Sequence, residues 1–166
     1  MKNAGFTLVE LLVALVLIAV MSALALPALG EMADRQRRLD AAQQLASGIR
    51  TARTEAIMRN QIVTIHGIDD DWSNGWRIIL DADGKGPDDD DRVLIERATS
   101  GKTRVVGNQK VKNHIRFNGL GEVMGAANGT LFVCLKDQPV SHYQVVLALT
   151  GRVRIRNQEQ PEALCG

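Results

Sequence analysis

The chain has 166 residues, and its 20 Lys and Arg against 19 Asp and Glu give a formal net charge of +1. This length suits one modest globular domain plus an additional segment, and the small net charge excludes a uniformly basic nucleic-acid binder. The charge is uneven: residues 67–96 hold ten acids against three basic residues, and residues 102–166 hold nine Lys or Arg against four acids. We therefore expect separate acidic and basic surfaces, the second of which can attract a polyanion.

An apolar run from Phe6 to Leu29 contains a single acid, Glu10, and is long enough to span a bilayer. A secretory signal peptide, with Lys2 as its basic start and cleavage near residues 23–28, is the competing interpretation. Glu10 counts against it, because a charge inside a membrane segment is costly and usually marks a function. The run contains no Lys or Arg, so we expect a cationic partner from elsewhere, such as the N-terminal amine of a neighbouring copy.

The stretch Gly5-Phe6-Thr7-Leu8-Val9-Glu10 ahead of this run resembles the start of type IV prepilins and type II secretion pseudopilins. The resemblance implies that a prepilin peptidase cuts after Gly5 and that Phe6, the new first residue, is methylated. It also implies that Glu10 neutralises the amine of an adjacent subunit during filament assembly. The expected organisation is a leader peptide at 1–5, a transmembrane and assembly segment at 6–29, and a periplasmic head at 30–166.

Pro27 lies near the end of the apolar run, where many members of this family carry a helix-bending proline. We expect a kink with local melting there, and the alternative is the start of a loop. From Glu31 to Arg59, apolar or small residues recur every three or four positions, which predicts an amphipathic helix at 31–59.

Beyond Asn60 the period becomes strand-like, which predicts a β-sheet region over 61–166. The expected strands are Gln61–Ile68, Trp76–Leu80, Arg92–Ala98, His114–Asn118, Thr130–Leu135, Tyr143–Leu149 and Arg152–Arg156. One long helix followed by a series of strands favours an α+β fold with antiparallel sheets over a parallel sheet.

Four segments of the head resemble the minor pilins and pseudopilins of the FimT/GspH family, and FimT most of all. They are Trp72, Gly75-Trp76-Arg77, Asp81-Ala82-Asp83-Gly84 and Arg92-Val93-Leu94. The resemblance implies a type IV pilin-like fold, in which the second half of a long N-terminal helix packs on a globular head. Residues 100–130 match no part of this pattern.

The two cysteines, Cys134 and Cys165, have no histidine at metal-ligand spacing, and a disulfide between them is the simpler interpretation. Such a bond would fasten the C-terminus and imply an oxidising compartment. The alternative is a pair of free thiols in a cytosolic protein.

The acidic stretch Asp81–Asp91 suggests calcium, but Lys85 and Arg92 stand where an EF-hand loop needs oxygen ligands. We expect a solvated acidic loop instead. The histidines at 66, 114 and 142 are scattered in the sequence, so they are interpreted as core or surface residues. We accordingly predict no metal, no cofactor, no catalytic residue and no enzymatic activity.

The segment Gly151-Arg152-Val153-Arg154-Ile155-Arg156 is the sharpest candidate site. Strand side chains alternate between faces, so three arginines about 7 Å apart are expected on the face opposite Val153 and Ile155. Guanidinium groups suit phosphate because they donate two hydrogen bonds at once. The alternatives are an edge strand protected by charge, and arginines paired with the acids at 88–91.

Gly151-Arg152-Val153-Arg154 resembles the GRxR motif of FimT-type minor pilins, which take up DNA during natural transformation. The resemblance implies DNA contacts from Arg152 and Arg154, and Arg156 extends the row beyond the motif. Basic residues elsewhere join it only if the fold brings them alongside: Lys102, Arg104, Lys110, Lys112 and Arg116.

The expected partners are therefore the DNA phosphate backbone, read without sequence preference, other pilins in a filament, the prepilin peptidase and the inner membrane. We expect a single-pass inner-membrane protein with a periplasmic head that later enters a pilus, near its tip. The alternative is a structural minor pilin or GspH-like pseudopilin that primes pilus or secretion pseudopilus assembly without binding DNA.

Overall fold

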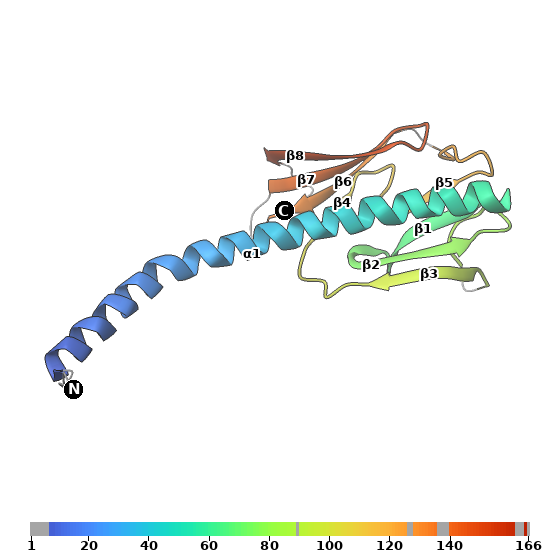
Figure 1. Cartoon of the computed structure of the whole chain (residues 1–166). Coiled ribbons are helices and arrows are strands. Elements are labelled where there is room, and N and C mark those ends of the chain that lie inside the picture. The colour runs from blue at the N-terminus through green and yellow to red at the C-terminus, as the bar shows by residue number, and fades with distance from the viewer. Residues whose placement is uncertain (1–6, 89, 126–127, 136–139, 162–164, 166) are drawn as a thin grey trace. The chain divides into compact units, whose positions relative to one another are not determined.

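The computed structural model describes residues 7–88, 90–125, 128–135, 140–161 and 165. The chain divides into two compact units, residues 1–36 and 37–166. Within the described residues, one helix precedes eight strands (Figure 1): α1 (Leu8–Arg59), β1 (Val63–Ile68), β2 (Asp71–Leu80), β3 (Arg92–Ala98), β4 (Val105–Gly107), β5 (His114–Phe117), β6 (Gly129–Cys134), β7 (Val140–Leu147) and β8 (Val153–Pro161).

In the first unit, α1 has exposed apolar side chains along the predicted membrane segment, among them Leu11, Val16 and Leu24. This part of α1 is long and apolar enough to cross a membrane. The helix continues without interruption through Pro27, so the predicted local melting is absent from α1. Proline lacks a backbone donor and its ring crowds the carbonyl four residues earlier, but melting would leave more backbone groups unpaired, which is costly in a bilayer.

In the second unit, α1 buries one face that carries Ala42, Leu45, Ala46, Gly48, Ile49, Ala52 and Ala56. Gly48 lets the helix approach Trp76 closely, because a β-carbon at Gly48 would lie 2.7 Å from the indole ring. The predicted amphipathic period therefore corresponds to a packed helix face.

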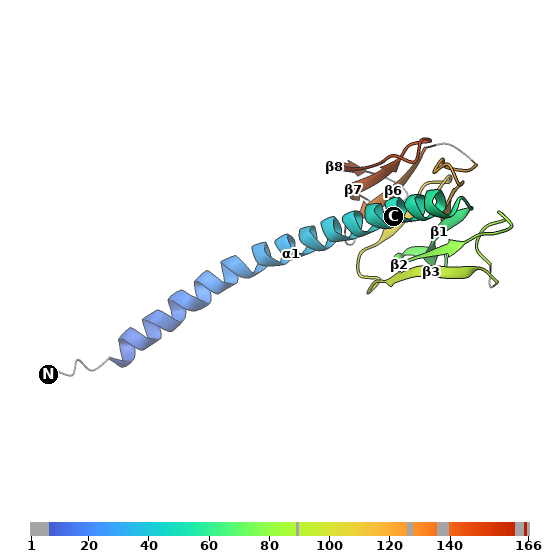
Figure 2. The ribbon, with the colours of Figure 1, turned by 45° about the vertical axis from the view of Figure 1, so that its right-hand side comes forward.

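The strands of the second unit form two four-stranded sheets, ordered β3-β2-β1-β5 and β4-β6-β7-β8 (Figures 1 and 2). Neighbouring strands are antiparallel throughout. The α+β expectation is confirmed. The short strand β4 was not predicted, and β2 begins at Asp71, earlier than the predicted Trp76.

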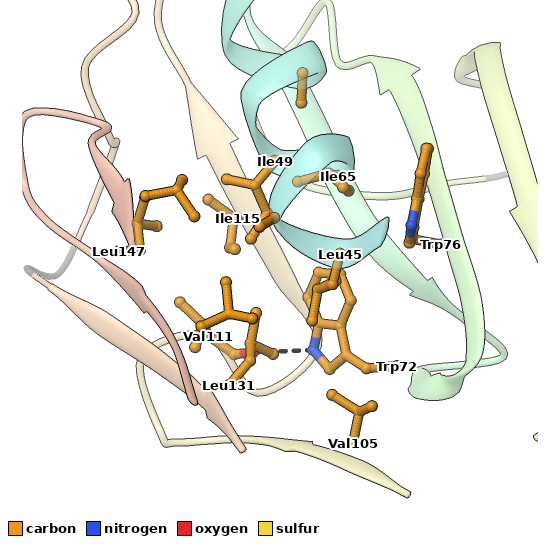
Figure 3. Packing of buried hydrophobic residues seen from close by; sticks show 14 of the residues in the cluster. Leu45, Ile49, Ile65, Trp72, Trp76, Val105, Val111, Ile115, Leu131 and Leu147 are labelled. Atoms are coloured by element: carbon orange, nitrogen blue, oxygen red, sulfur yellow. Dashed lines mark hydrogen bonds between the residues drawn. The ribbon is translucent and has the colours of Figure 1, made fainter. Parts of the chain in front are cut away.

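One apolar core joins α1 to both sheets, and Figure 3 shows Leu45 and Ile49 of the helix among residues of the strands. Trp72 lies inside this core, and its Nε1 donates hydrogen bonds to the carbonyl oxygens of Val111 at 3.0 Å and Lys112 at 2.8 Å. The indole buries a large apolar surface while its polar group stays satisfied. The family-like residues Trp72 and Trp76 are thus structural.

A second, smaller cluster lies on the other face of the β4-β6-β7-β8 sheet, where Phe132, Cys134 and Cys165 are buried beside Val106. The predicted disulfide is present: Cys134 and Cys165 are joined with a sulfur–sulfur distance of 2.05 Å. It holds Cys165 against this face of the sheet, close to the end of β6.

Candidate nucleic-acid interface

The three predicted arginines lie on or beside β8, one of the two edge strands of its sheet (Figure 1). Arg152, Arg154 and Arg156 are exposed, whereas Val153 is buried and Ile155 packs against the core. The two-residue alternation predicted for this segment is therefore present. It gives a row of guanidinium groups on the face of β8 that is turned away from the core.

Gly151 sets the turn that leads into β8. Its φ is +74°, in the left-handed region that favours glycine. The backbone N–H of Gly151 donates to the carbonyl of Ala148 at 2.9 Å, and the N–H of Ala148 donates to the carbonyl of Arg152 at 2.9 Å. These bonds close the turn between β7 and β8 and fix where Arg152 begins the arginine row.

The turn also packs against α1. A β-carbon at Gly151 would lie 2.6 Å from Nε of Arg53 and 2.7 Å from the carbonyl oxygen of Gly121. Arg53 is half-buried, and its Nε donates a 2.7 Å hydrogen bond to that same carbonyl. Glycine is therefore required at 151 both for its backbone conformation and for the space it leaves to Arg53.

No carboxylate neutralises the arginine row within the described residues. The described ion pairs lie elsewhere, at Arg59–Glu55, Arg77–Glu96 and Lys85–Asp83. The acids of the β2–β3 loop belong to the other sheet and bond within their own loop: the N–H of Asp88 donates to Asp91 at 3.0 Å. Of the acids at 88–91, the structure describes all but Asp89. For the described ones, the alternative in which they pair with Arg152–Arg156 is wrong.

Arg50 of α1 reaches the same strand, and sequence reasoning missed it. Its Nη2 donates to the carbonyl oxygen of Val153 at 3.4 Å, and its side chain is exposed. The sequence did contain one indication that Arg50 lies close to the sheets: it directly follows Ile49, at the border of the apolar helix face. The sequence does not reveal which strand such a border residue will meet.

The basic residues between Lys102 and Arg116 are arranged differently. Lys102 and Arg104 precede β4, which β6 and β7 separate from β8. Arg116 lies on β5 in the other sheet, and its guanidinium donates to the carbonyl of Gly84. These three residues therefore do not extend the arginine row.

The acidic loop is only partly solvated, which corrects the sequence expectation. Asp81 is fully buried. Its Oδ2 accepts hydrogen bonds from Thr64 Oγ1 at 2.8 Å and from the N–H of Gly86 at 3.1 Å. These donors satisfy Oδ2 and anchor the start of the loop, whereas the buried Oδ1 has no hydrogen-bond partner among the described residues. In the described part of the chain, no group of three or more His, Cys, Asp or Glu side chains is placed to hold a metal ion.

Two of the scattered histidines meet in the fold. His66 of β1 and His114 of β5 are directly paired across the antiparallel strands, and both are half-buried. Burial lowers the pKa of both side chains. The nearby cation Arg77 lowers the pKa of His66 further, and Arg116 does the same for His114. His142 is buried, and its Nδ1 accepts a 3.1 Å hydrogen bond from Nε of Arg38.

Glu10 has a local role that the sequence analysis did not identify. Its backbone N–H donates to Thr7 Oγ1 at 3.2 Å, and its Oε2 accepts from the N–H of Thr7 at 3.5 Å and from Oγ1 of Thr7 at 3.4 Å. This reciprocal pattern is a capping box at the start of α1. The predicted cleavage and methylation residues, Gly5 and Phe6, lie outside the described residues.

Comparisons with known proteins agree with this architecture. Residues 41–151 match the family model of the type II transport protein GspH, and residues 1–26 match the prokaryotic N-terminal methylation motif. The family match ends at Gly151, so the three arginines of the row lie beyond it. A comparison with curated proteins gave no match.

Two crystal structures of the type IV minor pilin FimU of Pseudomonas aeruginosa (strain PAO1) have a similar fold. The structure in space group P65 has a TM-score of 0.62 and 18% identity, covering 75% of this chain and 98% of that one. The structure in space group P21 has a TM-score of 0.61 and 17% identity, covering 78% of this chain and 96% of that one. At these identities the likeness concerns the fold.

The methylation motif, the apolar N-terminal helix and the head of two antiparallel sheets define a membrane-anchored protein of the type IV pilin class. The GspH model matches more than half of the chain, and the chain belongs to the GspH family.

Proposed function

We propose that this protein is a minor type IV pilin whose non-enzymatic task is to bind DNA during uptake for natural transformation. The observation that carries the proposal is the exposed row of Arg152, Arg154 and Arg156, which has no carboxylate partner among the described residues. Unpaired like charges on one strand face repel one another, and an external polyanion removes that repulsion.

Phosphate is the chemistry that this row suits best. Each arginine offers a planar fork of N–H donors, and alternate strand residues stand about 7 Å apart, so each guanidinium can meet a separate phosphate of a polymer. Contacts to phosphate carry no sequence information and depend strongly on salt. The protein therefore binds DNA without sequence preference.

The membrane and assembly roles are part of the same proposal. The peptidase cuts after Gly5, Phe6 is methylated, and Glu10 neutralises the N-terminal amine of an adjacent subunit. Before assembly the protein resides in the inner membrane with its head in the periplasm, and it then enters a pilus near the tip. The exposed apolar face of α1 and the match to the methylation motif support this sequence of events.

The test is fluorescence anisotropy with the full chain in a neutral detergent and a labelled DNA duplex, over a series of salt concentrations. The variant Arg152→Gln with Arg154→Gln should bind more weakly, and the slope of log K against log salt should become shallower by about 0.9 for each lost contact. The matched control is Arg92→Gln with Arg97→Gln, which removes two exposed arginines from the edge strand β3 of the other sheet.

A second candidate is a structural subunit that primes assembly of a pilus or secretion pseudopilus, with the arginines in subunit contacts. The family match favours it, because the matched family is described as a type II transport protein and the match stops before Arg152. This candidate prevails if the parent protein fails to bind DNA at low salt, or if the Arg152 and Arg154 double variant binds as tightly as the parent.

A further inference from the structure

Strand β8 has one free edge, and the hydrogen bonds of the turn show which carbonyls point to it. The carbonyl of Arg152 accepts from Ala148, on the β7 side of the strand. Successive carbonyls of a strand point to opposite sides, so the carbonyl of Val153 points to the free edge. A guanidinium that reaches this oxygen therefore lies outside the sheet, beside the edge of β8.

Arg50 occupies that position. Its Nη2 lies 3.4 Å from the carbonyl oxygen of Val153, the residue between Arg152 and Arg154. By standard backbone dimensions this oxygen is about 3 Å from the α-carbon of Arg154, which puts the Arg50 guanidinium within roughly 7 Å of that α-carbon. The Arg50 guanidinium therefore lies close to the backbone of β8 beside Arg154, whose own side chain leaves that backbone on the face turned away from the core.

The Arg50 side chain keeps its charge and most of its donors available. A guanidinium has five N–H donors, and the described contact uses one of them on a neutral carbonyl. Within the described residues Arg50 has no ion pair. Arg59 lies about two and a half turns further along α1. It differs from Arg50 because its Nε forms an ion pair with Glu55 at 2.8 Å.

We propose that Arg50 is a fourth phosphate-contacting arginine, so that the DNA site is built jointly by helix α1 and strand β8. This inference rests on the proposed function and adds to it the path of the polymer. A small anion needs only a pair of arginines on β8 to bind it, whereas a chain of phosphates can contact cations on both β8 and α1. The backbone of the DNA therefore crosses the free edge of β8 toward α1.

The experiment measures DNA affinity of the full chain in neutral detergent by anisotropy across a salt series, with Arg50→Gln, Arg50→Lys and Arg59→Gln. Arg50→Gln should lower the affinity roughly three- to tenfold near 0.1 M salt and make the salt slope shallower by about 0.9. Arg50→Lys should retain the parent slope because it keeps the charge. Arg59→Gln, on the same helix, should change neither quantity.

The outcomes separate this inference from the proposed function. If Arg50→Gln keeps the parent affinity and slope while the Arg152 and Arg154 double variant loses affinity, the inference is overturned and the proposed function stands. If the parent does not bind at low salt, the proposed function fails and this inference with it. If Arg50→Gln unfolds the protein, Arg50→Met, which keeps an unbranched side chain without the charge, decides: a slope shallower by about 0.9 supports the contact, and the parent slope refutes it.

Discussion

The side chain of Arg53 lies directly against Gly151, so closely that a β-carbon on the glycine would stand 2.6 Å from the Arg53 Nε. This contact joins helix α1 to the turn that starts the arginine row. Gly151→Ala should therefore destabilise the protein through both its positive φ and this collision. The backbone conformation alone costs about 1–2 kcal/mol for a residue with a side chain.

The matched control is Gly101→Ala. Gly101 has a similar φ of +67°, but the nearest atom to its β-carbon would be Oδ1 of Asn74, at an ordinary 3.5 Å. Thermal or denaturant unfolding of the full chain should show a clearly larger loss of stability at 151 than at 101. Equal losses would mean that the Arg53 contact yields without cost.

A second prediction concerns Gly48. Replacing a helix glycine by alanine usually stabilises a protein by about 0.5–1 kcal/mol. At Gly48 the new methyl group would lie 2.7 Å from the Trp76 ring, so Gly48→Ala should lower the unfolding temperature instead. Gly30→Ala, whose β-carbon meets nothing within 4 Å, should leave it unchanged or raise it. A stabilising Gly48→Ala would refute the tight packing of α1 on Trp76.

The disulfide should contribute strongly to stability. Cys134 and Cys165 are 31 residues apart, and closing such a loop stabilises the fold by about 3–4 kcal/mol in the chain-entropy model. We expect the double variant Cys134→Ser, Cys165→Ser to unfold at a lower denaturant concentration, and the parent to match it after reduction. A reduced parent as stable as the oxidised one would contradict this.

Stability should fall as the pH drops below about 6.5, because of the paired residues His66 and His114. Burial lowers the pKa of both in the folded protein, so the unfolded chain binds protons first as the pH falls through 6.5. The loss grows until the pH falls below the folded pKa values. Nearby acids, Asp70 for both histidines, oppose the shift without reversing it.

Unfolding measured between pH 7.5 and 5.5 checks this, since the carboxylates titrate mostly at lower pH. The double variant His66→Gln, His114→Gln should show a flatter dependence of unfolding free energy on pH than the parent. The explanation fails if the parent and the variant lose stability equally over this range.

The two roles of Glu10 can be separated in cells. Glu10→Gln removes the charge but keeps an oxygen that can accept from Thr7, whereas Glu10→Ala removes both. If Glu10 acts in assembly through its charge, both variants should reach the membrane normally but be depleted from sheared filaments, as measured by immunoblot. Thr7→Ala, which removes the cap alone, should assemble. Normal assembly of Glu10→Gln would contradict the charge role.

The helix, most strands and the outward arginines follow from local periodicity, which explains why they were predictable. Val153 and Ile155 face inward because strand side chains alternate, and this needs no knowledge of the partner strand. The short strand β4 has three residues, too few for an alternation to be recognised. Its pairing with β6 is a consequence of tertiary structure.

The missed features depend on pairs that are far apart in the sequence. Asp81 is buried because Thr64 donates to it from another strand, and His66 meets His114 through the pairing of β1 with β5. Arg50 reaches β8 only because of how α1 packs on the sheet. Sequence patterns identify faces and elements, but they do not specify which faces meet.

The disulfide also has a mechanical consequence. Cys165 follows β8 and is bonded to Cys134 at the end of β6, so the polypeptide that includes β7 and β8 is a covalently closed loop. The arginines lie at the start of β8 and the disulfide lies beyond its end. If the protein binds DNA as proposed, a force on the arginines that unzips β8 from β7 can lengthen the chain only as far as this closed loop allows, because the sulfur–sulfur bond still ties the far end of the loop to the interior strand β6.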